Sequence, residues 1–182
     1  DRDRARDELP QSAGGKTVMT TEPKFIPDAA VTVEMGEGER MRVKMIDCVG
    51  YVVPDALGTI EEGQPRMVRT PWQSDPMPFT AAAELGTKKV INEHSTIGIL
   101  VSTDGSTGEI PRDSYVFAEE RIVKELRAIG KPFAIVLNSA HPTDPQSIAL
   151  GEELEEKDSA PVALVNCLEL NGEDIKNILQ MI

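Results

Sequence analysis

The order of strand-like and helical segments from Phe79 to the end of the chain limits the fold most strongly. Short apolar runs rich in β-branched residues alternate there with longer segments whose apolar residues recur every three or four positions. Such a run, apolar throughout, is typical of a strand buried on both faces of a parallel sheet. The expected elements are helix 79–93, strand 97–101, helix 115–129, strand 133–137, helix 145–157, strand 162–165 and helix 172–182. This alternation predicts an α/β fold: a mostly parallel sheet with helices on both faces, joined by right-handed crossovers.

The segment before this alternation predicts an antiparallel pair of strands. Residues 29–35 alternate between apolar and polar side chains, and residues 36–39 read Gly-Glu-Gly-Glu, a composition typical of a tight turn. A second apolar run follows at 41–46. We expect residues 29–46 to form a hairpin at an edge of the sheet.

The strand 41–46 ends abruptly on Asp47, and Gly50 stands three residues further on. In a nucleotide-binding α/β sheet, a carboxylate at a strand end can orient a hydrated Mg²⁺, and a glycine nearby lets the backbone approach a γ-phosphate. The pattern is that of the Walker B and switch II segments of GTPase-like P-loop proteins. A buried strand followed by an Asp-initiated turn has the same appearance, so both interpretations stay open at this point.

The first 25 residues contain one apparent phosphate loop and one pair of adjacent threonines. Gly15, Lys16 and Thr17 spell the end of such a loop, but Pro10 stands where the motif needs a glycine, and no apolar strand precedes it. We therefore expect a flexible loop here. Thr20 and Thr21 come next, and one of them can serve as a switch I threonine that meets Mg²⁺ and the γ-phosphate; entry into a strand is the alternative.

Residues 51–78 contain five prolines and the only tryptophan, Trp72. Connections in compact domains rarely exceed about 6 residues, so the sequence predicts a long insertion loop that is either disordered or functional. Trp72 is either an anchor for a partner or part of a lid that packs on its own domain.

Charge and cysteine content exclude several classes of protein. The net charge of −12 disfavours a nucleic-acid binder, which needs a basic face. The two cysteines form no CxxC pair and the two histidines no cluster, so neither a disulfide framework nor a zinc site is indicated. No apolar stretch reaches the roughly 20 residues of a transmembrane helix. The sequence predicts a cytoplasmic location and no membrane span.

The longer motifs identify a family. In chain order they read KTVMTTEPKF, IDCVGY, TPWQSDPMPFTAAAELGTKKVI, EHSTIGILVSTDGS and GKPFAIVLNS. Over essentially its whole length the chain resembles the N-terminal nucleotide-binding domain of the stage IV sporulation protein A family, the spore-coat morphogenetic ATPases of endospore-forming bacteria. The resemblance implies a P-loop NTPase-like fold, related to the translation-factor GTPases, that hydrolyses ATP.

The resemblance also implies a cell-biological role. Members of the family assemble with copies of themselves into a shell in the mother-cell cytoplasm, on the outer surface of the forespore. The expected partners are further copies of the chain, other spore-coat morphogenetic proteins and a small membrane-bound anchor protein. No nucleic acid is expected among them.

Carried over residue by residue, the resemblance assigns a site for ATP and Mg²⁺. Asp47 is the Walker B carboxylate that holds the metal through water, and Gly50 is the switch II glycine. Thr20 or Thr21 is the catalytic sensor threonine, with Thr21 also expected near the metal. Asn138 and Ser139 begin the segment that binds the base.

That base-binding segment lacks the residue by which GTPases recognise guanine. It reads Asn138-Ser139-Ala140-His141 where GTPases read NKxD. The fourth position therefore lacks the carboxylate that accepts two hydrogen bonds from guanine, and guanine selectivity has no visible source. This departure favours ATP over GTP.

A second departure concerns the start of the chain. In the family, the Walker A loop and the strand that leads into it precede the point where this sequence begins. We therefore expect residues 1–182 to form a single, truncated ATPase domain with two exposed inner strand edges and weak binding of Mg²⁺-ATP. An alternative function is a scaffold module for assembly that has no nucleotide chemistry.

Overall fold

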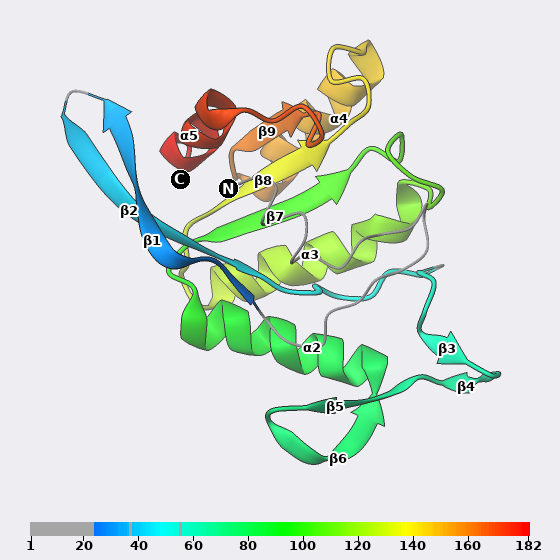
Figure 1. Ribbon diagram of the computed structural model, residues 1–182. Helices are drawn as coiled ribbons and strands as arrows, with labels where there is room; N and C mark the ends of the chain where they lie inside the picture. Colours follow the sequence, from blue (N-terminus) through cyan, green and yellow to red (C-terminus); the bar gives the residue numbers. More distant parts are fainter. Residues whose placement is uncertain (1–23, 37, 55) are drawn as a thin grey trace. The chain divides into compact units, whose positions relative to one another are not determined.

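The structure is a computed structural model that describes residues 24–36, 38–54 and 56–182 (Figure 1). The segment with Lys16, Thr17, Thr20 and Thr21 lies outside the described residues, so the predictions made for it are not addressed. The chain divides after Ser95 into two units, an N-terminal unit, Asp1–Ser95, and a C-terminal unit, Thr96–Ile182. That the whole chain acts as a single domain stays a prediction.

The C-terminal unit contains the predicted parallel sheet. Its strands lie in the order β7-β8-β9 and pair in parallel. They are β7 (Gly98–Thr103), β8 (Phe133–Asn138) and β9 (Val162–Val165), and the helices are α3 (Asp113–Ala128), α4 (Pro145–Asp158) and α5 (Gly172–Gln180). The alternation read from the sequence is confirmed here, with boundaries shifted by a few residues at most.

The two faces of this sheet are covered by different helices, as Figure 1 shows for α3 and α5. On one face Leu100 and Ile135 pack against Val123 of α3. On the other face Val136 and Ala163 pack against Ile178 of α5. Because β8 is central and covered on both sides, its residues 134–137 are all buried, which explains their continuous apolar sequence.

Gly98 at the start of β7 gives a stability prediction. A Cβ built on it would lie 3.0 Å from Leu126 Cδ1 and 3.2 Å from Phe133 Cβ. We expect Gly98→Ala to lower the free energy of unfolding by about 1–3 kcal/mol, since overpacking displaces its neighbours. Thermal unfolding measures this change. Gly108→Ala is the matched control, because a Cβ there meets nothing within 4 Å; equal melting temperatures for the two variants would contradict the prediction.

The N-terminal unit begins with the predicted hairpin. Strands β1 (Lys24–Gly36) and β2 (Glu39–Asp47) pair antiparallel, with Val31 opposite Val43 and Lys24 opposite Asp47. Within the described part of the chain these two strands form a sheet of their own. The hairpin is confirmed, while its place at the edge of a larger sheet stays a prediction.

The insertion 51–78 differs from the loop that the sequence predicts, because it contains two short hairpins. They are β3 (Ile60–Glu61) with β4 (Gln64–Pro65), and β5 (Met67–Thr70) with β6 (Gln73–Pro78). The first turns through Glu62 and Gly63, which both have positive φ, as a two-residue hairpin turn of type I′ requires. Prolines are compatible with two-stranded hairpins, where every strand has an edge that needs no N–H donor. Proline content alone therefore misled the prediction.

Trp72 packs on its own unit. The helix predicted over 79–93 appears as α2 (Phe79–Lys89), continued by one π-helical turn, η1 (Val90–His94). A Cβ on Gly86 of α2 would lie 3.4 Å from two atoms of the Trp72 ring, and Lys89 Nζ lies 5.9 Å from the ring centroid. Of the two interpretations of Trp72, the structure supports packing of the β5-β6 hairpin onto α2.

Candidate functional site

Asp47 lies at the carboxyl end of β2, as the sequence predicts. Its side chain reaches solvent, yet partial burial among protein atoms raises the pKa of its carboxyl, an effect that the backbone N–H of Cys48 partly offsets. No ion pair or side-chain hydrogen bond joins Asp47 to another residue that the structure describes. A partly desolvated carboxylate without a cation is a group whose charged form a bound cation would stabilise.

Gly50 follows in a backbone conformation that favours glycine. Its φ is +78°, and a Cβ built on it would meet nothing within 4 Å. The open space above it would let another backbone or a ligand approach closely. The Cys48 thiol follows Asp47 directly, and burial raises the pKa of that thiol, an effect that a hydrogen bond from the Gly50 backbone partly offsets. The raised pKa favours the protonated thiol at neutral pH, which is the less nucleophilic form.

Asn138 ends β8 at the carboxyl edge of the parallel sheet. Its Oδ1 accepts a hydrogen bond of 2.9 Å from the backbone N–H of Cys167, in the segment that follows β9. This bond fixes the orientation of the amide, because only the oxygen can accept. The amide nitrogen is left with two donors that no described residue accepts from. Asn138 thus anchors a neighbouring loop and offers donors at the sheet edge.

Ser139 is fully buried, with 0% of its surface exposed. Its N–H donates to the Val165 carbonyl at 2.9 Å, and its hydroxyl accepts from the His141 N–H at 2.9 Å. The same hydroxyl lies 3.3 Å from that of Ser147 in α4. In this arrangement Ser139 supports the segment 138–141 from inside, and direct contact with a base stays a prediction.

Asp104, which the sequence analysis did not single out, is the most strongly perturbed carboxyl group at this edge. It follows β7 directly, and both of its oxygens accept hydrogen bonds from serines. Burial raises the pKa of Asp104, but hydrogen bonds from the neighbouring serines, Ser106 first among them, outweigh that effect and lower the pKa to about 2. Asp104 is therefore ionised at neutral pH and firmly held.

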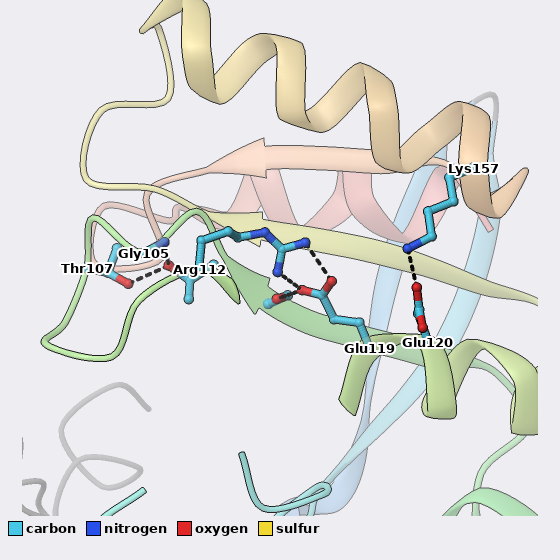
Figure 2. Close-up of polar contacts among 8 residues, drawn as sticks. Gly105, Thr107, Arg112, Glu119, Glu120 and Lys157 are labelled. Carbon is cyan, nitrogen blue, oxygen red and sulfur yellow. Dashed lines mark hydrogen bonds and ion pairs between the residues drawn. The ribbon is translucent and has the colours of Figure 1, made fainter. Parts of the chain in front are cut away.

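A buried ion pair closes the loop that begins at Asp104. Arg112 donates from two nitrogens to both oxygens of Glu119, at 2.5 and 2.6 Å (Figure 2). Ser102 of β7 donates to the same carboxylate. Gly105 approaches the Arg112 backbone so closely that a Cβ on it would lie 3.0 Å from Arg112 N. Loop 104–112 is thus fastened at both ends, to the sheet and to α3.

Most predicted site residues thus lie where strands end. Asp47 and Gly50 share one turn of the N-terminal unit, whereas Asn138 and Ser139 share the carboxyl edge of the C-terminal unit's sheet. The sequence analysis missed Asp104, Ser147 and the pair Arg112–Glu119. A signal for Asp104 was present, since an aspartate directly after an apolar strand is the argument already applied to Asp47.

The described residues form neither a cluster of metal ligands nor a helix suited to a bilayer. No cluster of three or more His, Cys, Asp or Glu side chains able to hold a metal ion occurs among them. A Mg²⁺ site built on one carboxylate, several waters and substrate phosphates needs no such cluster, so Asp47 fits that kind of site. In the part of the chain that the structure describes, no helix has the length and apolar character needed to cross a membrane.

Comparison with known proteins gives consistent matches. The family model described as "Stage IV sporulation protein A, ATPase domain" matches residues 1–182. Curated relatives named stage IV sporulation protein A are 51% identical over 180 residues in Bacillus anthracis and 49% over 180 residues in Bacillus subtilis (strain 168). A relative of that name in Clostridioides difficile (strain 630) is 50% identical over 181 residues.

These matches cover 99–100% of this chain but 37% of each relative. The chain therefore spans little more than a third of the length of those proteins. No solved structure matches it.

Proposed function

The chain belongs to the family of the stage IV sporulation protein A ATPase domain, and from this premise we propose that it binds and hydrolyses ATP with Mg²⁺ during spore formation. The P-loop NTPase-like α/β fold that the family implies agrees with the parallel sheet and its covering helices.

The observation that carries the proposal is the position and partial burial of the Asp47 carboxylate. A carboxylate at a strand end, desolvated enough to raise its pKa and unpaired among the described residues, is suited to hold the water shell of a Mg²⁺ that also meets the phosphates. Bound Mg²⁺ would neutralise charge on the transferred phosphoryl group. Gly50 would bring its backbone to the γ-phosphate, and Thr20 or Thr21 would place the attacking water.

Asn138 supports the proposed base site. Its amide nitrogen has donors to offer, and ring nitrogens of a purine are acceptors. Adenine has an exocyclic amine that can donate a hydrogen bond to a backbone carbonyl. Guanine has two adjacent N–H donors, and a carboxylate is the group that accepts from both. The segment 138–141 contains no carboxylate, which supports ATP as the nucleotide.

We expect the full-length protein to hydrolyse ATP with a kcat/KM at least about tenfold above that for GTP, the factor that corresponds to one net hydrogen bond of about 1.4 kcal/mol. Phosphate release at steady state measures kcat/KM for each nucleotide. His141→Asp places a carboxylate at the fourth position of the segment and should shift the ratio toward GTP. Equal turnover of ATP and GTP would contradict the prediction, and failure to bind ATP at all would favour the scaffold alternative.

The finer biological role rests on the family resemblance. In this proposal the complete protein assembles with copies of itself on the outer, mother-cell side of the forespore. It is held there by a small membrane-bound anchor protein and recruits other spore-coat proteins. Sedimentation of the full-length protein with and without ATP tests self-assembly directly: an ATP-dependent polymer supports it, and a monomer under both conditions contradicts it.

A further inference from the structure

Two consecutive backbone N–H groups after Asn138 are held by serine hydroxyls. The N–H of Ala140 donates to Ser106 Oγ at 2.8 Å, which connects it to the loop after β7. The N–H of His141 donates to Ser139 Oγ at 2.9 Å. The path of the proposed base segment is therefore set by groups that lie behind it.

The direction of each hydroxyl in this network follows from counting protons. Ser147 Oγ donates to Asp104 Oδ2 at 2.7 Å, and a serine has one hydroxyl proton to give. In the 3.3 Å contact between Ser139 and Ser147, Ser139 must then be the donor. Ser106 likewise donates its proton to Asp104 Oδ1, at 2.5 Å. Each serine thus accepts on one side and donates on the other.

The result is two chains of hydrogen bonds that end on one carboxylate. One runs from the His141 N–H through Ser139 and Ser147 to Oδ2, and the other from the Ala140 N–H through Ser106 to Oδ1. We call the four residues Asp104, Ser106, Ser139 and Ser147 the Asp104 relay. An ionised carboxylate only accepts, so it polarises both chains in the same direction, and such chains strengthen cooperatively.

The relay also explains how a charged Asp104 is stabilised although it is partly buried. Asp104 is partly withdrawn from water, which by itself disfavours its charge. The hydroxyl groups of Ser106 and Ser147 donate directly to this carboxylate, and hydrogen bonding by serines keeps its pKa near 2. The Asp104 carboxylate accepts from neither of the two amides, whose acceptors are Ser106 and Ser139, so the side chain acts on them through the serines. The backbone N–H of Asp104 separately donates to the Asn138 carbonyl at 3.3 Å, a bond that a substitution of the side chain leaves in place.

We propose that Asp104 is a positioning residue for nucleotide binding: through the relay it fixes the backbone from Asn138 to His141 and thereby the direction of the Asn138 amide donors. The conformational part of this inference stands on the hydrogen bonds alone. The functional part rests on the proposed ATP binding. Ser139 then contributes to the base site by holding the segment from behind.

The kinetic test uses Asp104→Asn in the full-length protein. Asparagine has the same shape but keeps one acceptor, so one branch of the relay loses its end point. We expect the KM for ATP to rise about tenfold, equivalent to about 1.4 kcal/mol, while kcat stays within about twofold. Glu109→Gln is the matched control, because it removes an exposed charge from the same loop. An unchanged KM in Asp104→Asn, or a loss confined to kcat, would overturn the functional part.

The conformational test needs no nucleotide. Hydrogen exchange, resolved to single amides by mass spectrometry with fragmentation, is measured on Ala140 and His141 relative to amides of β8. We expect Ser106→Ala to speed exchange at Ala140 only, Ser139→Ala at His141 only, and Asp104→Ala at both. Since the Asp104 carboxylate accepts from neither amide, and its backbone bond to Asn138 is kept in the variant, acceleration at both identifies the relay. Unchanged exchange in Asp104→Ala, or an equal acceleration throughout β8, would overturn it, even if the parent protein proved unable to bind ATP.

Discussion

Replacing Asp47 by alanine is expected to lower ATP hydrolysis by the full-length protein about 100-fold, the size of effect seen when one electrostatic group that stabilises a transition state is removed. The physical reason is that Asp47 is the described carboxylate best placed to orient the water shell of a phosphate-bound Mg²⁺. Phosphate release at saturating Mg²⁺-ATP measures the effect.

The same substitution should leave the fold intact. Burial raises the pKa of Asp47, so the folded state disfavours its charged form at neutral pH, and removal of the carboxyl should leave the melting temperature unchanged or slightly higher. Asp75→Ala, at an exposed aspartate of β6, is the matched control and should retain wild-type turnover. Wild-type turnover in Asp47→Ala would remove Asp47 from the mechanism, and a fall in melting temperature would assign it a structural role.

The C-terminal unit could be predicted from the sequence because local pattern and final environment agree there. Strand β9 has the predicted bounds, and α4 differs from its prediction by one residue at its end. A strand buried on both faces has apolar side chains on both faces, so the strand at 133–137 could be recognised from its continuous apolar run alone. The position of Asp47 at a strand end followed from the same kind of reasoning.

The insertion and the relay could not be predicted for two different reasons. In 51–78, proline content suggested an irregular loop, but proline is excluded only where a strand must donate on both edges, and these hairpins have no such strand. In the relay, Ser147 and Asp104 are 43 positions apart, and only the parallel register of β7 and β8 brings their loops together. Local sequence patterns describe neighbouring residues only, so they could not predict the contact between Asp104 and Ser147.

Ser139 shows the same limit within the proposed site. The family resemblance places Ser139 in the segment expected to meet the base, and direct contact with the base stays a prediction. The structure buries the side chain completely, next to β9 and the start of α4, which its position after a strand does not reveal. Whether a polar side chain faces a ligand or the interior depends on which loops meet over it, and that is a property of the tertiary fold.

Replacing Arg112 by methionine is expected to lower the free energy of unfolding of the C-terminal unit by about 3 kcal/mol, because it leaves a buried carboxylate without its partner. Only 7% of the Glu119 side chain and 18% of the Arg112 side chain are exposed, and the two share a pair of parallel hydrogen bonds. Native-state hydrogen exchange at the amides of β8, which report opening of the sheet, measures the change.

A second ion pair in the same unit provides the matched comparison for Arg112→Met. Lys157 and Glu120 are 2.7 Å apart and join α4 to α3, but 41% and 52% of their side chains are exposed (Figure 2). Lys157→Met should therefore cost no more than about 1 kcal/mol. The double variant Arg112→Met with Glu119→Leu removes both buried charges and should recover most of the lost stability. Equal costs for Arg112→Met and Lys157→Met, or no recovery in the double variant, would show that desolvation of Glu119 does not control the stability of this unit.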